Sequence, residues 1–586
     1  MMRTRYLLIR ASKAAIAGAR ARLAAYLEPS GRFGVVTERD DILVIADQAT
    51  IDLGDEAIVI GALFQLGGSG RLSALSRNMR EMTAAVRGDY LLSSYWGGYV
   101  AILIGPDPRR CDILRAPMGD LPCYYVNTAD TLFAGSDLDI LIAAGAPLAG
   151  VSWPAIIRHL AATDMRRPET CISGVRELAG GQRLSTTDDG GTIDARWSPW
   201  DWAAPERQIF DPTEAMRRLR GAIDHSVAMQ ASIHERMLLM LSGGLDSSIV
   251  ATALARTDRP FTCVNLVAED ATSDERSYAR AVAGALGCPL LERNRNISSV
   301  DLTRSDAARL PRPSARNFTQ ATAAIVRSVV DETRATAVVH GGGGDNVFCS
   351  LQSARPATDC LLDANAAGQF WPTVGTIASL AQVSVWTVAL RAWRLKRRWG
   401  RHYPWPADLR FLSADAAAAV GSIIDHQWLD APENASPGKA AHVALVAQAQ
   451  SVAEGADVED PVPSLSPLLT QPVVEACLGI PSWFWFDRDR NRAIARDTFA
   501  DRLPPHVADR RSKGSPDGFI AALYETNRPL IRALLADGVL ARAGLLDLTQ
   551  VMAALDDPRP VVGHAHLRIL QLIDAEAWAR GWIDRA

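Results

Sequence analysis

The sequence predicts an α/β protein of two parts, an N-terminal α+β domain over residues 1–205 and a domain with a parallel sheet over residues 206–586. The chain has 586 residues, which is too many for one hydrophobic core. Residues 33–145 contain short apolar runs divided by Gly, Asp and Pro, a pattern typical of strands and turns. Beyond residue 206, apolar runs of strand length lead into glycine-rich loops, and the first loop precedes a helical pattern.

The composition is that of an ordinary globular protein, with 48% hydrophobic and 22% charged residues. Lys and Arg number 62 against 66 Asp and Glu, so the net charge of −4 gives no indication of nucleic-acid binding. No apolar run reaches the roughly 20 residues of a transmembrane helix, and the Arg-rich N-terminus lacks the apolar core of a secretory signal. Eight scattered cysteines without a CxxC pair fit neither a disulfide framework nor a zinc site. We therefore expect a cytoplasmic protein with reduced thiols.

The first elements follow from short apolar segments. Residues 6–10 predict a strand and residues 14–27 a helix or a loop. Residues 198–213, rich in Pro, Trp and charge, predict a linker, and Thr213 is expected to cap a helix that ends near Met229. Further strands of the N-terminal domain are expected over residues 41–46, 58–64, 99–104 and 132–134.

The most informative stretch is MLSGGLDSS, residues 240–248, between a run of strand length and the start of a helix. Glycines let the backbone approach a ligand, and the first turn of the helix directs N–H groups and a positive dipole end at an anion. Asp246 fits such an anion site only if a divalent cation lies between its carboxylate and the phosphate oxygens. The stretch therefore predicts a site for a metal-bound pyrophosphate rather than an ordinary glycine turn.

Two more strands are expected in this domain. Residues 261–267 predict a buried strand, and residues 337–339 predict another that leads into HGGGGDN, residues 340–346. Four glycines and Asp345 at the carboxyl end of a strand predict a second site for an anion and a metal, with a glycine-rich structural loop as the alternative.

Later segments carry weaker signals. Residues 379–406 combine tryptophans with a basic cluster and predict a helix, either solvated or suited to a peptide, a partner or a membrane surface. The charged residues 487–492 are interpreted as a solvated turn, and Glu275 as an acid in the first turn of a capped helix. Lys513, within RRSKGSP, is either a solvated surface lysine or a cation that stabilises developing charge in a site.

The loop SGGLDSS resembles the PP-loop of the N-type ATP pyrophosphatases, most closely that of the asparagine synthetase and β-lactam synthetase branch. Residues 33–145 resemble, more weakly, the glutamine-amidotransferase domain that precedes the synthetase domain in asparagine synthetases. Further similarities lie in SDERSYA at residues 273–279, GGGGDN at 341–346, PLLTQPVVEACLGIP at 467–481 and RRSKGSP at 510–516.

This resemblance implies a ligase that adenylates a carboxylate with ATP and releases pyrophosphate. Mg²⁺ would be held by Asp246 and Asp345, and Lys513 would stabilise the adenylate and the departing pyrophosphate. The residues implied in ATP binding are Leu241, Ser242, Gly243, Gly244, Leu245, Asp246, Ser247, Ser248, Val264, Leu266, Gly341 and Gly342.

Three departures from the family pattern refine the expectation. The first cysteine is Cys111, whereas glutamine hydrolysis in the amidotransferase domain needs a cysteine at the N-terminus, so this domain is expected to make no ammonia. Asn346 replaces a family Glu. Gly342 stands where asparagine synthetases have Glu and β-lactam synthetases have the Tyr of their base dyad. An enzyme without that base suits a peptide α-amine, whose pKa of about 7.7–8.0 leaves it partly neutral.

Residues 341–348, 467–481 and 510–514 are most similar to the lasso-peptide cyclases. Such enzymes adenylate an Asp or Glu side chain of a precursor peptide, and the α-amine of the peptide then closes a macrolactam ring. The resemblance implies ATP and Mg²⁺ as cofactors, and a precursor peptide, a leader-binding protein and a peptidase as partners. The alternatives are a β-lactam synthetase, an ammonia-using asparagine synthetase and a non-catalytic scaffold.

Overall fold

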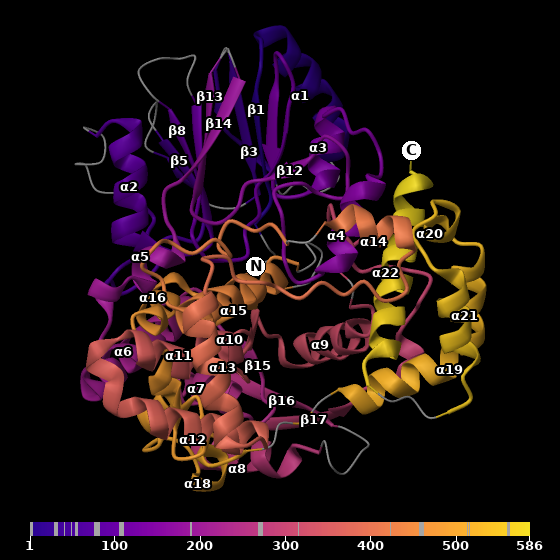
Figure 1. Ribbon diagram of the computed structural model, residues 1–586. Helices are drawn as coiled ribbons and strands as arrows, with labels where there is room; N and C mark the ends of the chain where they lie inside the picture. Colours follow the sequence, from indigo (N-terminus) through magenta and orange to yellow (C-terminus); the bar gives the residue numbers. More distant parts are fainter. Residues whose placement is uncertain are drawn as a thin grey trace.

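A computed structural model gives the arrangement of most of the chain. Two antiparallel sheets lie at one end of the molecule, and helices surround a parallel sheet at the other (Figure 1). The residues it describes are 4–27, 33–39, 41–47, 50–52, 57–74, 82–104, 111–187, 190–267, 274–314, 316–421, 424–455, 462–511, 514, 516–559 and 563–585.

Two six-stranded antiparallel sheets form the first part of the chain. In order across the first sheet lie β12 (Arg176–Glu177), β10 (Tyr124–Asn127), β11 (Leu132–Gly135), β1 (Tyr6–Arg10), β3 (Ile42–Ala46) and β2 (Gly34–Glu38). Across the second lie β14 (Gly190–Ala195), β13 (Gln182–Thr187), β9 (Cys111–Arg115), β8 (Tyr99–Ile104), β5 (Ala57–Gly61) and β4 (Thr50–Asp52).

The two sheets pack face to face and are covered by helices on their outer faces. Leu8 of β1 and Ile102 of β8 belong to one buried cluster, which residues of both sheets form. The neighbouring Leu7 instead packs with α1 (Lys13–Leu27) and α3 (Leu138–Ala144), because successive side chains of a strand point to opposite faces. Leu103 likewise packs with α2 (Ala84–Ser94). The result is a four-layered arrangement of helix, sheet, sheet and helix.

The parallel sheet has the order β17 (Leu290–Asn294), β16 (Phe261–Val267), β15 (Met237–Met240), β18 (Ala337–His340) and β19 (Ser464–Leu465). All four neighbouring pairs run parallel. One face packs on α6 (Pro212–Ser232) and α7 (Leu245–Leu254), and the other on α9 (Thr319–Thr333). The chain passes outward from β15 to β17 and then returns to the other side of β15, so the order reverses between β15 and β18.

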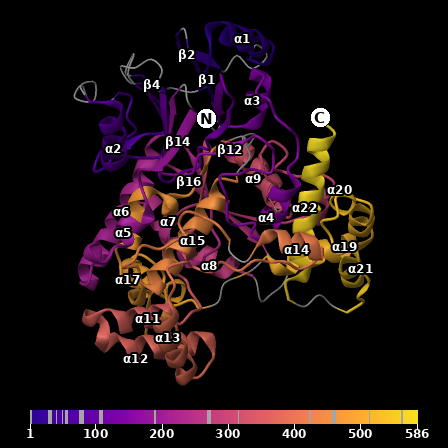
Figure 2. The ribbon, with the colours of Figure 1, turned by 45° about the horizontal axis from the view of Figure 1, so that its top comes forward.

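The remaining described chain is mostly helical and also contains the two-stranded sheets β6 (Phe64–Gln65) with β7 (Tyr95–Trp96) and β20 (Phe486–Asp487) with β21 (Arg490–Asn491). The helices named below or labelled in the figures are α4 (Trp153–Ala161), α5 (Pro199–Ala203), α8 (Arg276–Leu286), α10 (Gly344–Val347), α11 (Arg355–Leu362), α12 (Phe370–Ala381), α13 (Val385–Arg398), α14 (Ala414–Val420), α15 (Pro437–Ala453), α16 (Gln471–Leu478), α17 (Ala493–Phe499), α18 (Pro505–Ala508), α19 (Asp517–Ala536), α20 (Val539–Arg542), α21 (Leu548–Asp556) and α22 (Ala565–Ile583). The α12–α13 pair lies at the end of the molecule opposite the antiparallel sheets (Figure 2). None of the described helices is long and apolar enough to cross a bilayer alone. Among the described helices, only Ala364–Ala381 taken together with α13 has the length and composition for a span, and these two segments are bent by 117° relative to each other.

Most predicted elements lie where the sequence placed them, and the predicted cap of one helix is wrong in detail. The strands at residues 6–10 and 99–104 have the predicted bounds, and residues 14–27 are helical. The cap of α6 is Asp211, whose carboxylate accepts a hydrogen bond from the Thr213 N–H, and not Thr213 itself. The predicted linker contains α5 and is held in place, because Trp200 is buried.

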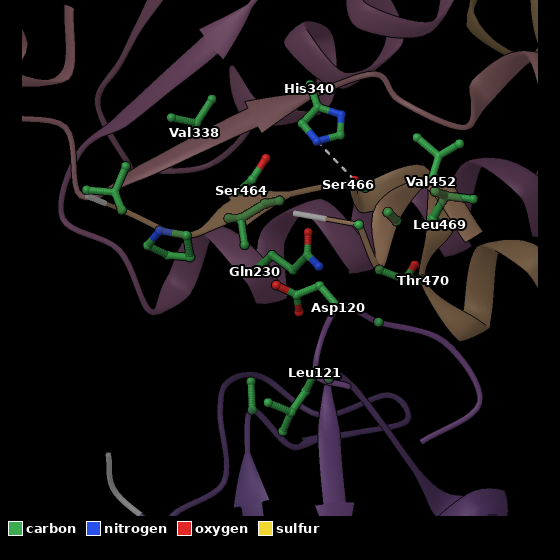
Figure 3. Close-up of a pocket in the computed structure, with 18 of the residues that line it drawn as sticks. Asp120, Leu121, Gln230, Val338, His340, Val452, Ser464, Ser466, Leu469 and Thr470 are labelled. Atoms are coloured by element: carbon green, nitrogen blue, oxygen red, sulfur yellow. Dashed lines mark hydrogen bonds between the residues drawn. The ribbon is translucent and has the colours of Figure 1, made fainter. Parts of the chain in front are cut away.

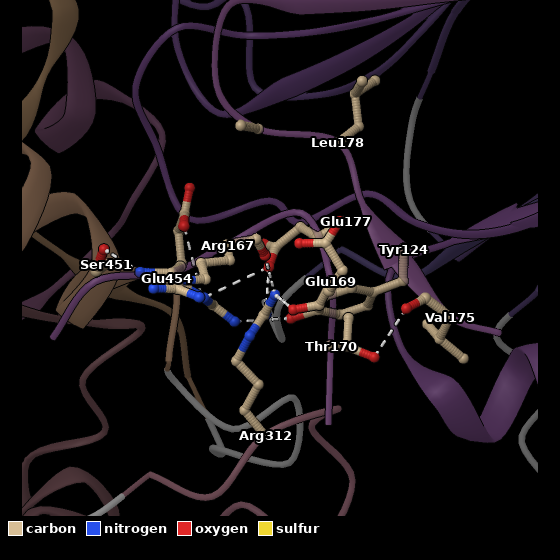
Figure 4. A network of polar contacts seen from close by, with 12 residues as sticks. Tyr124, Arg167, Glu169, Thr170, Val175, Glu177, Leu178, Arg312, Ser451 and Glu454 are labelled. Carbon is tan, nitrogen blue, oxygen red and sulfur yellow. Dashed lines mark hydrogen bonds and ion pairs between the residues drawn. The ribbon is translucent and has the colours of Figure 1, made fainter. Parts of the chain in front are cut away.

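A buried network of ion pairs joins the antiparallel sheets to the second part of the chain (Figure 4). Arg115 of β9 lies 3.2 Å from Glu177 of β12 and 2.5 Å from Glu454, which follows α15. Arg166 and Arg312 complete the network around Glu177. All five side chains are at most 10% exposed. Because the partners come from separate parts of the sequence, the network fixes how these parts pack.

Glu475 of α16 gives a first testable prediction about the same contact region. Its carboxylate accepts hydrogen bonds from Trp197 Nε1 and Gln471 Nε2, both at 2.9 Å, and burial raises its pKa to about 7. A carboxyl group with a raised folded-state pKa keeps its proton longer than in the unfolded chain, so stability falls as the pH rises from about 4.5 to 7. Glu475→Gln should remove this loss and raise the unfolding free energy at pH 8 by about 1–3 kcal/mol.

Urea unfolding at pH 5 and pH 8 measures this effect. Glu214→Gln is the control, because that carboxylate pairs with Arg217 and Arg218 at the surface and should change stability little. A Glu475→Gln protein that is less stable than the parent at pH 8 would contradict the prediction.

Candidate active site

The two predicted glycine loops lie next to each other at the carboxyl edge of the parallel sheet. Met240 ends β15 and pairs with His340, which ends β18. The loop after β15 leads into α7, and the loop after β18 leads into α10. This is the point at which the strand order reverses, and ligands of open α/β sheets bind in the crevice outside such a point.

The loop after β15 presents backbone N–H groups at the start of α7. Gly244 is the N-cap residue and has no side chain to bond the first turn, so the N–H groups of that turn remain for a ligand. Ser242 Oγ accepts a hydrogen bond from the Gly244 N–H and lies 3.2 Å from Ser247 Oγ. Gly243 has a φ of +69°, and a Cβ there would lie 2.5 Å from the Ala279 nitrogen of α8. Glycine is therefore required where the loop passes α8.

Glycines also let the two loops touch. A Cβ on Gly341 would lie 2.5 Å from the Ser247 nitrogen, and one on Gly344 would lie 2.3 Å from Asp246 Cγ. The first and last glycines of the four-glycine run therefore have a physical cause, since side chains on Gly341 and Gly344 would push the second loop away from α7. The close approach brings Asp246 and Asp345 together.

Arg492 bridges the two carboxylates. Its Nη1 lies 3.1 and 3.3 Å from the two carboxylate oxygens of Asp246 and 2.5 Å from Asp345 Oδ1. Arg492 is 9% exposed and precedes α17 with a φ of +53°. The interpretation of residues 487–492 as a solvated turn is therefore wrong for Arg492. The sequence contained no signal that distinguishes Arg492 from Arg488 or Arg490, because only the fold brings it to the two aspartates.

Asp246 and Asp345 suit a shared Mg²⁺, because oxygens from both loops converge on one guanidinium nitrogen. Mg²⁺ in nucleotide sites is commonly held by one or two carboxylates together with phosphates and water. No group of three or more His, Cys, Asp or Glu that could hold a metal occurs among the described residues. The remaining ligands would thus come from phosphate and water, and the bound ion would offset charge on the pyrophosphate oxygens.

Residues 218–580 match the family described as asparagine synthase, which is more than half of the chain. The chain belongs to the asparagine synthase family. Members of this family are ATP-dependent, AMP-forming amide ligases, and they typically use Mg²⁺. The matched residues include both glycine loops and Arg492.

The other comparisons add less. No curated protein matches the chain. Two solved structures each cover 50% of this chain. The allosteric regulatory enzyme of purine biosynthesis has 9% identity, a TM-score of 0.23 and 80% of its own chain covered. The glutamine phosphoribosylpyrophosphate amidotransferase from B. subtilis, complexed with ADP and GMP, has 11% identity, a TM-score of 0.22 and 67% covered. At these TM-scores the likeness supports no conclusion.

The space beside Gly342, the position at which the resemblance implies a base in other branches, is filled by a neighbouring ring. A Cβ on Gly342 would lie 2.4 Å from His340 Nδ1. The Gly342 N–H donates to Nδ1 at 3.0 Å, so the ring hydrogen is on Nε2 and is directed to Ser466 Oγ at 3.1 Å. Burial lowers the pKa of His340 to about 4, which keeps the ring neutral. A larger residue at position 342 would require His340 to move.

Of the two residues of β16 that the resemblance implies in ATP binding, the structure favours Leu266 over Val264. The Val264 carbonyl accepts a hydrogen bond from the Leu241 N–H at 2.9 Å, so its backbone is bonded toward β15. Leu266 lies two residues further along and directs its peptide groups to the same side, beyond the end of β15. Its backbone can therefore meet a ligand in the crevice.

Glu275 ties the segment around residue 513 to the first glycine loop. Its Oε1 accepts hydrogen bonds from Arg510 Nη2 at 2.8 Å and from the Gly514 N–H at 3.0 Å. The Arg510 guanidinium also stacks 4.1 Å from the centre of the Tyr278 ring, beside Gly243. The interpretation of Glu275 as an acid in the first turn of α8 is therefore wrong: Glu275 is the N-cap residue, and its carboxylate binds Arg510 and Gly514 instead of the helix. Lys513 itself lies outside the described residues, and its role stays a prediction.

Two other predicted features do not contact the carboxylates. Asn346 directs its amide to the Leu445 carbonyl at 2.8 Å and to Gln448 at 3.1 Å, so it binds α15. The predicted basic helix is α13, which lies at the far end of the molecule (Figure 2). Trp386 on this helix is 71% exposed, and Arg397 stacks on Trp393.

Proposed function

We propose that this asparagine synthase family member is a lasso-peptide cyclase. It adenylates an Asp or Glu side chain of a precursor peptide and joins it to the N-terminal amine of the same peptide, with release of AMP and pyrophosphate. The observation that supports this most is the state of position 342, where no side chain is present and His340 fills the space.

The absence of a base at position 342 separates the family branches. Ammonium and the amine of a small β-amino acid are mostly protonated at neutral pH and gain from a positioned base. A peptide α-amine has a lower pKa, near 7.7–8.0, and is partly neutral without such help. His340 with a pKa of about 4 is a weak base, and both ring nitrogens already have partners. The nucleophile that this site suits best is therefore a peptide α-amine.

The first part of the chain offers no thiolate for glutamine hydrolysis among its cysteines. Cys111 and Cys171 have pKa values raised to about 12 by burial, and the pKa of Cys123 is raised to about 11. Such thiols are neutral at physiological pH and are poor nucleophiles. This supports an amine that arrives with the substrate rather than ammonia made by the enzyme.

The residues of the site have separable roles in this proposal. The α7 N-terminus and Ser242 bind the polyphosphate, and Arg492 can exchange its carboxylate contacts for phosphate oxygens when ATP enters. Lys513 stabilises the charge of the adenylate and of the tetrahedral oxyanion. The attacking amine loses a proton, the acyl–oxygen bond to AMP breaks, and AMP leaves with the electron pair.

ATP–pyrophosphate exchange with a set of carboxylates tests the proposal. The substrates are a precursor peptide from a small reading frame beside the gene, free aspartate with ammonia, and a carboxyethylated amino acid. We expect exchange only with the peptide, and a product that has lost one water. An N-acetylated peptide is the matched control, because it should support exchange without ring closure.

Four results would overturn the proposal. Exchange with aspartate alone would favour the asparagine synthetase alternative, and exchange with the carboxyethylated amino acid alone would favour the β-lactam synthetase alternative. ADP as the nucleotide product would exclude adenylation altogether. No exchange with any substrate would favour the scaffold alternative.

A further inference from the structure

A cavity of about 620 Å³ lies between the antiparallel sheets and the parallel sheet. Figure 3 shows Asp120 and Leu121 on the side of the first part of the chain, opposite Val338, His340 and Ser464 of the second part. None of the residues predicted as ATP ligands lines it. It is therefore a space separate from the nucleotide loops but beside them.

The cavity adjoins both glycine loops through consecutive residues. Met240 and His340 line it, and each is followed directly by a loop of the candidate active site. Leu469 also lines it and packs on the second loop, where a Cβ on Gly343 would lie 2.3 Å from Leu469 Cγ. A molecule in the cavity can thus extend to the place where a carboxylate meets ATP.

The first part of the chain forms the opposite wall with small and apolar residues. Ala62, Gly97, Gly98 and Gly119 line this wall, and so do Phe64 and Trp96, whose ring centres lie 4.7 Å apart. Gly97 and Gly119 have φ values of +137° and +124°, a backbone conformation that residues other than glycine rarely adopt. Glycine is therefore required at both positions by the backbone conformation and by the close approach of the neighbouring backbone.

Two residues that line the cavity also carry a buried polar atom without a hydrogen-bond partner among the described residues. Trp96 Nε1 is a buried donor of this kind and Gln230 Oε1 a buried acceptor. Buried polar groups in proteins nearly always have a partner, so a ligand or water would complete these bonds only if the two side chains turn toward the cavity. A peptide backbone offers both an N–H and a C=O at each residue.

We infer that this cavity between the two parts of the chain binds a segment of the precursor peptide, with the first part of the chain acting as its substrate-binding wall. The inference rests on the proposed cyclase function. The volume of the cavity, about 620 Å³, lies within the range of about 300–1,000 Å³ that is usual for ligand pockets. Arg71, Arg316 and Arg327 line it together with Asp120 and Asp306, so it has no single-sign cluster that would suit a second polyphosphate. Holding the chain here brings the amine and the activated carboxylate together, which ring closure requires.

Tryptophan substitutions that fill the cavity test the inference. Ala62→Trp acts on one wall and Val326→Trp, on α9, acts on the other. Ser69→Trp and Ser328→Trp are the matched controls. Ser69 lies near Ala62 in sequence and Ser328 near Val326, and both are exposed residues that do not line the cavity. We expect each filling variant to raise the KM for the peptide at least tenfold while the affinity for ATP stays within twofold.

A photoreactive benzoylphenylalanine at position 62 or 326 gives a second measurement that does not depend on catalysis. Crosslinks from both positions to the labelled precursor peptide are expected, and none from positions 69 and 328. If the parent enzyme cyclises the peptide while the filling variants keep their KM and the crosslinks are absent, the cavity assignment is wrong and the proposed function stands. If the parent neither binds nor activates the peptide, both fall.

Discussion

Replacement of Asp246 or Asp345 by alanine is expected to lower the rate of AMP formation by about 10²–10³-fold or more. Both carboxylates lie at the point where the strand order reverses, within 3.3 Å of one nitrogen of Arg492. Removing either one leaves the arginine charge unbalanced and takes away a ligand for the cation that offsets the pyrophosphate charge. The measurement is single-turnover formation of AMP at saturating ATP.

Two controls separate chemistry from folding in this experiment. Asp345→Asn keeps the shape of the side chain and should lose nearly as much activity as Asp345→Ala, with an unchanged melting temperature. Asp258→Ala changes an exposed carboxylate near the end of α7 and should keep the parent rate. Ring formation at the parent rate in Asp246→Ala would disprove the site.

Substitution of Arg115 by methionine is expected to lower the unfolding free energy by about 3–5 kcal/mol. The guanidinium is 2% exposed, pairs with Glu177 and Glu454, and donates to the Leu121 and Leu178 carbonyls. Its removal leaves two buried carboxylates with fewer cations and two carbonyls without a donor. Because Glu454 belongs to the second part of the chain, the packing between the parts should loosen as well.

Urea unfolding of Arg115→Met against the parent measures this loss. Arg196→Met is the control, since Arg196 pairs with Asp89 in a partly exposed position and should cost at most about 1 kcal/mol. An Arg115→Met protein within 1 kcal/mol of the parent would show that the network contributes little beyond its desolvation cost.

The same network gives the pH range in which stability is lost. Burial alone would raise the pKa of Glu177, but the charges of Arg166, Arg312 and Arg115 outweigh it and lower the pKa to about 2. A carboxyl group with a depressed folded-state pKa stabilises the fold above its unfolded value, near 4.5, and loses this contribution as the pH falls toward 2. Acid unfolding of the parent should therefore steepen in this interval, and the slope should be smaller in Arg115→Met.

The sequence by itself determined the local parts of this protein. The strand over residues 261–267, the loop SGGLDSS before a helix and the four glycines before Asp345 were all predicted from short patterns. These features are local, because strand periodicity and glycine conformation act over a few neighbouring residues. The composition of the predicted linker did not indicate that it contains α5 or that Trp200 is buried in a core formed by distant residues.

Only the tertiary structure decided which distant side chains meet. Arg492 lies 246 residues from Asp246 in sequence, and Arg115 lies 339 residues from Glu454. His340 fills the space at Gly342 through its ring orientation, and the cavity exists only because two sheets from separate parts of the chain face each other. Such contacts depend on the packing of whole elements, for which one sequence carries no local signal.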